Sequence, residues 1–168
     1  NVLGYKVTSG MMTLSAGAAY SNGTETSVAV TFADLVEGLT IGAGTGNNNN
    51  VDLTTEDDID TYFATYTMGS ITVGAQKTSV DAETAAQDIE RNSYGISMAV
   101  NENLSVSYGV SDTEFDESGL VDEENSGISA SYTAGGMTLG VVHNQKENEA
   151  GTSATDREVT ELKLTLAF

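Results

Sequence analysis

The sequence predicts an all-β fold, an antiparallel up-and-down β-barrel that spans a membrane. Three observations lead to this prediction: a two-residue hydrophobic period along the chain, connections that alternate between short and long, and aromatic residues placed near strand ends. No segment shows a convincing helical period. No run of about 18 apolar residues is present, so the sequence offers no membrane-spanning helix.

The two-residue period is clear in segment 13–20, where Leu14, Ala16 and Ala18 alternate with small polar residues. Such alternation predicts a β-strand with one apolar face. The pattern returns about eleven times along the chain, which predicts about eleven strands. The apolar positions span residues 3–7, 14–20, 28–32, 39–43, 62–68, 71–75, 94–100, 104–110, 128–132, 137–141 and 162–168.

The connections between these strands alternate strictly in length. Short turns rich in Gly, Asn and Asp are predicted at residues 9–10, 34–38, 68–70, 101–103 and 134–136. Longer loops are predicted at residues 21–25, 45–60, 78–91, 111–125 and 144–157. In an up-and-down meander, this order places all short turns at one end and all long loops at the other.

The charge is strongly negative and unevenly distributed. The formal net charge is -19, and 20 of the 25 acidic residues fall in the long loops. Because the phosphates of nucleic acid would repel such an acidic chain, nucleic acid is not an expected partner. The absence of Cys excludes disulfides and cysteine-ligated zinc.

Alternation alone does not distinguish a membrane barrel from a soluble sandwich, but the residue types do. Aromatic residues form two groups near the strand ends, as at two lipid–water interfaces, whereas a sandwich places large rings mid-strand. The opposite face is rich in Ser, Thr and Gly, which predicts a water-filled lumen. Closure is required because an open sheet edge in hydrocarbon leaves backbone groups unsatisfied.

The last nine residues resemble the closing strand of Gram-negative outer-membrane proteins, with alternating apolar residues and a terminal aromatic. The matching positions are Leu162, Leu164, Leu166 and Phe168. With the acidic loops, the chain looks most like a general diffusion porin of the alphaproteobacterial type. The resemblance implies recognition of this strand by the barrel-assembly machinery, contact with outer-membrane lipids and lipopolysaccharide, and a homotrimer. It also implies passive diffusion of small hydrophilic solutes and ions, without a cofactor or catalysis.

Residues 1–168 are expected to form a single barrel domain that is the C-terminal portion of a larger barrel. Bacterial single-chain barrels have an even number of strands, whereas about eleven are counted here. A sixteen-stranded porin would have about five more strands in front. The loop that constricts the pore in that family would then lie outside this sequence or at its edge. The alternatives are a smaller barrel lacking one strand, or one strand that was not counted.

Polar residues on the lumen parity are candidates for lining the pore. They are Lys6, Gln76, Arg91, Arg157, Glu161 and Lys163. Glu161 and Lys163 could set part of the transverse field, or could neutralise each other. The two arginines could line the narrowest part, but pairing with adjacent acids such as Glu90 or Glu158 is the favoured alternative.

Acidic clusters in the loops are weak candidates for Ca²⁺ or Mg²⁺ ligands, through carboxylate oxygens. The candidate residues are Asp57, Asp58, Asp60, Asp122, Glu123 and Glu124. Their spacing matches no calcium loop, and a solvated acidic rim is the simpler interpretation. Either way, the acids should concentrate cations at the pore mouth and give a mild cation preference that weakens at high salt.

Two other classes of function are kept as alternatives. A secreted all-β structural or adhesive protein would be soluble and would have a filled interior, with the acidic loops as its binding surface. A barrel enzyme would need a nucleophile, a base and an orienting group, and His143 is the only histidine. No local signature joins a serine to His143, so catalysis is not expected.

Overall fold

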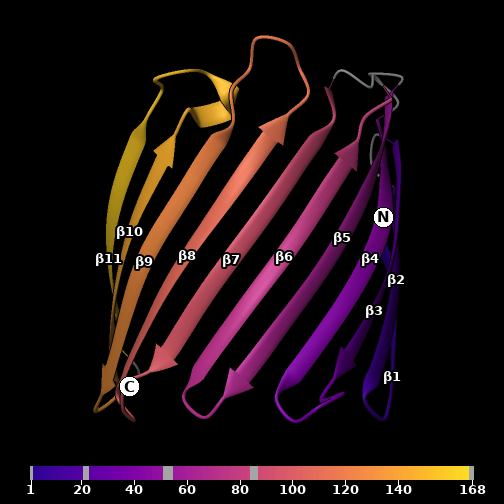
Figure 1. Ribbon diagram of the computed structural model, residues 1–168. Coiled ribbons are helices and arrows are strands. Elements are labelled where there is room, and N and C mark those ends of the chain that lie inside the picture. The colour runs from indigo at the N-terminus through magenta and orange to yellow at the C-terminus, as the bar shows by residue number, and fades with distance from the viewer. Residues whose placement is uncertain (1, 21–22, 51–54, 84–86, 167–168) are drawn as a thin grey trace.

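The computed structural model describes residues 2–20, 23–50, 55–83 and 87–166. These residues form one antiparallel sheet of eleven strands, in which every strand pairs only with its neighbours in the chain (Figure 1). The strands are β1 (Val2–Ser9), β2 (Met12–Tyr20), β3 (Gly23–Ala33), β4 (Leu39–Asn50), β5 (Thr55–Met68), β6 (Ile71–Asp81), β7 (Ile89–Ala99), β8 (Leu104–Phe115), β9 (Glu123–Ala134), β10 (Met137–Glu147) and β11 (Arg157–Leu166). The predicted number of strands and their up-and-down order are therefore confirmed.

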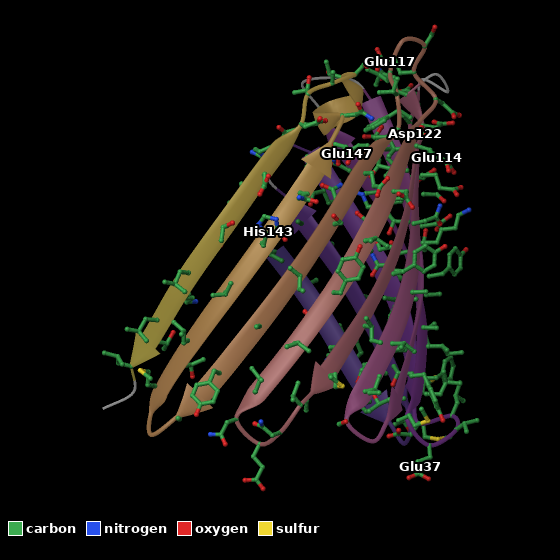
Figure 2. The ribbon with its side chains drawn as sticks, turned by 60° about the vertical axis from the view of Figure 1, so that its left-hand side comes forward. Glu37, Glu114, Glu117, Asp122, His143 and Glu147 are labelled. Carbon is green, nitrogen blue, oxygen red and sulfur yellow. The ribbon has the colours of Figure 1, made fainter. Side chains whose placement is uncertain are left out.

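The sheet is curled into a trough with oblique strands, and β1–β4 curve behind the central strands in Figure 1. The short turns lie at the lower end of the view, and the long connections between β8 and β9 and between β10 and β11 lie at the upper end, as the alternation of connection lengths predicted. Figure 2 shows the same polarity in the acids: Glu37 lies at the short-turn end, whereas Glu114, Glu117 and Glu147 lie at the other.

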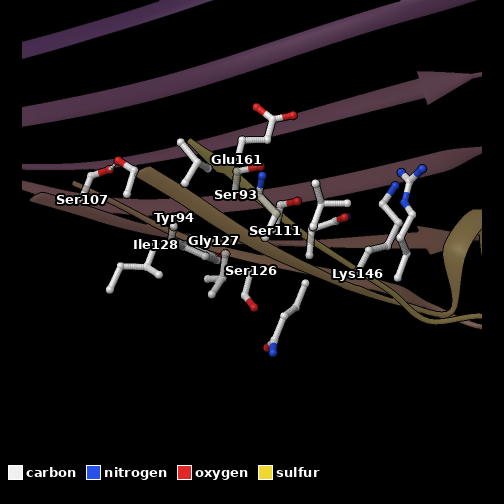
Figure 3. A pocket seen from close by; sticks show the side chains of 18 residues that line it. Ser93, Tyr94, Ser107, Ser111, Ser126, Gly127, Ile128, Lys146 and Glu161 are labelled. Atoms are coloured by element: carbon white, nitrogen blue, oxygen red, sulfur yellow. Dashed lines mark hydrogen bonds between the residues drawn. The ribbon is translucent and has the colours of Figure 1, made fainter. Parts of the chain in front are cut away.

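The two faces of the sheet have different chemistry. On β7, Tyr94, Ile96 and Met98 lie on the convex face, whereas Ser93 and Ser97 lie on the concave face, and the register carries this division to the neighbouring strands. In Figure 3, Ser93 and Glu161 project towards the N-terminal strands across the trough, and Ile128 projects the opposite way. The predicted apolar and polar faces are thus the outer and inner faces of a curved wall.

Among the described residues, no hydrophobic side chain is buried. Large apolar side chains on the convex face are instead open to the surroundings, with Leu162 71% and Ile128 56% exposed. In the described ranges, no helix is long and apolar enough to cross a membrane. A soluble sandwich with a filled interior therefore does not describe this chain, because its apolar faces have no second sheet to pack against.

The strands are longer than the apolar alternation predicted, with up to 14 residues in β5. On the convex face of β9, Tyr132, Ala130 and Ile128 are followed upwards by Ser126 and Glu124, while the pairing with β10 continues unbroken. We call the apolar part of the convex face the apolar band; it ends at Tyr62 on β5, Tyr94 on β7, Val110 on β8 and Ile128 on β9. The loop boundaries predicted at 21–25, 45–60, 78–91, 111–125 and 144–157 were wrong, because backbone pairing continues above this band independently of the side chains.

Glycine permits the tight connections at the short-turn end. Gly135 and Gly136 both have positive φ, 57° and 80°, as a two-residue hairpin of type I′ requires. Gly38 has φ 81°, and its carbonyl oxygen accepts a hydrogen bond of 2.9 Å from the Thr67 N–H. A Cβ at residue 38 would collide with the Thr67 carbonyl oxygen, so both conformation and space exclude a side chain there.

If the convex face contacts lipid, Ile96→Arg will destabilise the barrel by about 2–4 kcal/mol, the cost of a basic residue at the bilayer midplane. Ser97→Arg places the same side chain one residue further along β7, on the concave face, and should have little effect on stability. Equilibrium unfolding in lipid vesicles measures both changes. Equal destabilisation by the two variants would contradict the assignment of the faces.

Gly38→Ala is expected to lower folding stability more than Gly69→Ala. Both glycines have positive φ, 81° and 60°, so both changes incur a backbone cost of about 1–2 kcal/mol. Only the Cβ at residue 38 meets the neighbouring backbone, whereas nothing lies within 4 Å of a Cβ at residue 69. The temperature at which the heat-modifiable gel band disappears compares the two variants, and equal midpoints would show that the collision is relieved.

Candidate pore wall

The concave face carries hydroxyl pairs that join neighbouring strands, with a few apolar residues such as Phe63 and Val142 between them. Ser107 and Ser129 are linked across β8 and β9 with 2.7 Å between their oxygens. Similar pairs connect Thr8 with Thr13, Thr61 with Thr78, Thr67 with Thr72 and Thr133 with Thr138, all at 2.9–3.1 Å. The hydroxyls satisfy each other and also offer lone pairs and protons to water or solutes in the trough.

A hollow of about 910 Å³ lies on this face over strands β7–β11. Ser93, Ser111 and Asn125 contribute small polar groups to its wall, and Lys146 and Glu161 add charge, as Figure 3 shows. Gly109 and Gly127 contribute only backbone, which keeps the wall thin at this height. The hollow is therefore wide, and its lining combines small polar groups and charged side chains with apolar ones such as Val142 and Val159.

The basic residues are concentrated on the concave face. Of the six Lys and Arg residues, five have the concave parity: Lys6, Arg91, Lys146, Arg157 and Lys163. The described acids with the same parity are Glu25, Asp57, Glu123 and Glu161. The wall of the trough is thus close to electrically balanced, although the whole chain is strongly acidic.

Acids are gathered on the convex face of the strands, above the apolar band, and most of these were predicted to lie in loops. Each strand from β5 to β11 contributes at least one: Asp58, Asp60, Asp81, Glu90, Asp112, Glu114, Glu124, Glu147 and Glu158. Lys77 lies among them and forms an ion pair of 2.6 Å with Glu90. The hydrogen bond from Lys77, helped by one from Asn92, lowers the pKa of the Glu90 carboxyl.

Glu123, at the upper end of β9 and above the apolar band, is the most heavily engaged acid of the concave face. It is only 5% exposed, and its carboxylate accepts hydrogen bonds from Asn125 Nδ2 at 2.8 Å, Ala150 N–H at 2.8 Å and Lys146 Nζ at 3.2 Å. Burial alone would raise the pKa of this carboxyl, but the three donors outweigh it and the pKa is lowered.

The predicted pore-facing residues all lie on the concave face, and their partners are now defined. Arg91 donates from Nε to Thr113 Oγ1 at 3.0 Å, and Arg157 pairs with Glu149 at 2.7 Å. The expected pairing of the arginines with adjacent acids was therefore wrong, because those neighbours project elsewhere. Gln76 donates to Thr78 at 3.3 Å.

The remaining three candidates lie near the two edges of the sheet. Lys6 is on β1, opposite Ser15 of β2, whereas Glu161 and Lys163 are on β11. In the described part of the chain, no ion pair joins Glu161 to Lys163. Lys6, Glu161 and Lys163 face the trough, as a role in the electric field of the pore requires. That role stays a prediction.

The candidate cation ligands are not gathered into a site. Asp57 lies on the concave face and Asp58 and Asp60 lie on the convex face, because strand residues alternate. Glu123 is engaged by Lys146, and Asp122 and Glu124 lie beside it in the chain. Within the described ranges, no group of three or more His, Cys, Asp or Glu residues is arranged to hold a metal ion. Binding of Ca²⁺ or Mg²⁺ by these acids stays an untested expectation.

His143 and the assembly signal both belong to the convex face. The His143 Nδ1 and the Thr160 Oγ1 are 2.9 Å apart, and Nε2 is 3.5 Å from a Glu158 oxygen. Leu162, Leu164 and Leu166 form an exposed apolar row on β11, as the terminal pattern predicted. Phe168, the last residue of that pattern, lies outside the described residues.

Comparison with known proteins agrees with this geometry. The model of the Gram-negative porin family matches residues 1–150. The chain belongs to the Gram-negative porin family. Membership of this family places the porin chain in the bacterial outer membrane. A search among curated proteins found no match.

Solved structures show the fold of this porin chain. The anion-selective porin from Comamonas acidovorans has a TM-score of 0.80 at 16% identity, with 100% of this chain and 59% of that chain covered. The outer-membrane protein OmpT of Vibrio cholerae, in its trimer form, has a TM-score of 0.64 at 16% identity, with coverages of 99% and 60%. The chain thus spans about three fifths of the length of these porins. The NanC porin, with a TM-score of 0.62 at 9% identity, is instead covered to 98% of its length.

Two residues of the wall were not singled out from the sequence. Thr113 is fully buried where β8 meets Arg91, and Lys146 is buried more than most lysines because it lies against Glu123. Concave parity could have identified both, but the predicted strands ended before residues 113 and 146. A pattern search that continues each strand beyond its apolar residues would have found them.

Thr113→Val is expected to destabilise the porin by about 1 kcal/mol, because it removes the fully buried hydroxyl that accepts the hydrogen bond from Arg91 Nε–H. Thr138→Val removes a similar hydroxyl from an exposed pair with Thr133 and should cost less than about 0.5 kcal/mol. Urea unfolding in vesicles gives both values. A Thr113 variant as stable as the Thr138 variant would show that Arg91 finds another acceptor.

Proposed function

We propose that this chain forms much of the wall of an outer-membrane channel for the passive diffusion of small hydrophilic solutes and ions. The observation that carries the proposal is the division of the sheet: exposed apolar side chains on the convex face and cross-strand hydroxyl pairs on the concave face. Hydrocarbon can cover the first surface, and water can fill the space behind the second. Membership of the porin family supports the same conclusion.

The mechanism requires no chemical step. Hydroxyl and amide groups of the wall replace part of the hydration of a passing solute, and the width of the pore sets the size limit. Catalysis at His143 is not part of the proposal, because Thr160 and Glu158 are its partners on the outward side of the wall.

We further propose that the channel has a mild cation preference that originates at its mouth. The concave wall has nearly equal numbers of acids and bases, so it does not strongly favour either sign. The acids above the apolar band attract cations over about 10 Å at 0.1 M salt and over about 3 Å at 1 M salt. The anion-selective porin from Comamonas acidovorans shows that this fold also accommodates the opposite preference.

The surroundings of the chain follow from the same arrangement. Lipid and the outer part of lipopolysaccharide would contact the apolar band and the acids above it, with divalent cations reducing the repulsion. The row of Leu162, Leu164 and Leu166 would present the closing strand to the barrel-assembly machinery. A homotrimer is proposed by similarity to OmpT, which has been solved in a trimer form.

The chain is proposed to be the C-terminal portion of a larger barrel that further strands complete. Coverage of about three fifths of the Comamonas and Vibrio porins supports this proposal. The alternative is a smaller barrel, supported by coverage of 98% of the NanC porin. The mass of the protein isolated from its source distinguishes the two.

The test of function is electrical. The full-length protein, reconstituted into a planar bilayer with a KCl gradient, should give stepwise currents whose reversal potential favours K⁺. The preference should be largest with gradients at or below about 0.1 M and should fade towards 1 M, because salt screens the acids of the mouth. A failure to form conducting steps would refute the channel. A reversal potential that favours Cl⁻ at low salt would refute the cation preference alone.

A further inference from the structure

The connection between β10 and β11 is folded against the concave face instead of extending into solvent. We call residues 148–155 the shelf; it includes the short 3-10 turn η2 (Glu149–Gly151). The Ala150 N–H donates to Glu123 Oε2 at 2.8 Å, and Lys146 holds the other oxygen of that carboxylate at 3.1 Å. Glu149 pairs with Arg157 at 2.7 Å. Concave-face residues from β9, β10 and β11 therefore hold the shelf.

A second group of contacts joins the shelf to the connection between β8 and β9. The Val121 N–H donates to the Gly151 carbonyl oxygen at 3.0 Å, and Asn148 Nδ2 donates to the Asp122 carbonyl oxygen at 3.0 Å. Gly151 is buried so closely that a Cβ would lie 2.9 Å from Leu120 and 3.2 Å from the Phe115 ring. Phe115 has the concave parity, so the shelf covers the upper ends of four adjacent strands, β8–β11.

The shelf is held against the preference of its own backbone. Among the described residues, four that are not glycine have positive φ, and three of them are in the shelf: Asn148 at 52°, Ala150 at 55° and Ala154 at 58°. Asparagine tolerates this region, but alanine incurs a cost of about 1–2 kcal/mol. Such strain persists only where the surrounding contacts over-determine the conformation. Loss of those contacts should therefore release the shelf to other conformations.

We propose that the shelf is a constriction of the pore mouth and that Glu123 is the residue that positions it. This inference rests on the proposed channel function. The hollow on the concave face lies directly below. Its wall includes Arg157, which pairs with Glu149 of the shelf, and Lys146, which pairs with Glu123. A solute that moves along β8–β11 must first pass the shelf. The docked shelf thus sets the size limit on this side of the mouth.

The same contacts explain why two basic residues at the mouth do not create an anion site. Lys146 is neutralised by Glu123 and Arg157 by Glu149, and both acids are committed to holding the shelf. Releasing the shelf therefore changes two properties together: the mouth widens, and Arg157 loses Glu149 and becomes available to anions. If the shelf had only a structural role, its release would change neither the width of the mouth nor the preference for anions.

The experiment compares Glu123→Gln with Glu124→Gln in the full-length protein. Both changes remove one negative charge at the same height, but Glu124 lies on the convex face opposite Asp112 and Glu147, away from the shelf. A hydrogen bond to a charged group contributes about ten-fold or more to an equilibrium constant, so the undocked fraction should rise about ten-fold or more in Glu123→Gln only.

Single-channel recordings and swelling of liposomes in sugars of increasing size measure the result. Glu123→Gln should increase conductance or open-channel noise, admit larger sugars and move the reversal potential towards anions. Glu124→Gln should leave the conductance, the open-channel noise and the size limit for sugars unchanged. If both variants form channels with the same conductance, noise and size limit, the shelf is not a constriction. If the wild-type protein forms no channel, the proposed function itself fails, so the two failures are distinguishable.

A second pair of variants leaves all charges in place. Ala150→Pro removes the N–H that Glu123 accepts and forbids the positive φ of 55°, so it should release the shelf even if Glu123→Gln folds poorly. Ala150→Gly keeps the N–H and favours the same φ, so it should preserve the wild-type size limit. Equal size limits for these two variants would overturn the proposal.

Discussion

The structure depends on one requirement, that the backbone of a chain in hydrocarbon must satisfy its own hydrogen bonds. No water is present there to compete, and each unsatisfied N–H or C=O costs several kcal/mol. The continuous pairing of β1 through β11 meets this requirement inside the sheet, and closure would extend it to the two edges. Because the backbone hydrogen bonds between strands provide this stability, apolar side chains can face lipid and polar side chains can face water. This explains why no apolar core is buried among the described residues.

The same freedom explains the distribution of charge. Above the apolar band the convex strands carry acids directly opposite acids, as in Asp58 with Asp81 and Asp112 with Glu124. Such pairs are unfavourable, but water and salt reduce the repulsion at an exposed surface. Bases are instead placed on the concave face, where Lys146 and Arg157 are neutralised by acids of their own side. The wall is therefore balanced, although the chain has a net charge of -19.

Much of the wall was predictable because parity in a strand is a local property. Gln76, Arg91 and Glu161 lie on the concave face because they share the period of the serines and threonines around them. The extent of the strands was not predictable from hydrophobicity, which ends at the edge of the apolar band while pairing continues. Thr113 and Lys146 were missed for this reason. The partner of Arg157 was also missed, because Glu149 reaches it only when the shelf folds back.

The sequence alone determined the number of strands, their antiparallel order, the two faces and the end at which the long connections lie, since each follows from local period and turn chemistry. Only the tertiary structure decided how far each strand continues, which charges neutralise one another and where the connection between β10 and β11 rests. These depend on contacts between residues far apart in the chain, such as Glu123 with the Ala150 N–H. The physical reason is that pleat and turn act over a few residues, whereas the position of a loop is set by partners that come together only when the sheet curls.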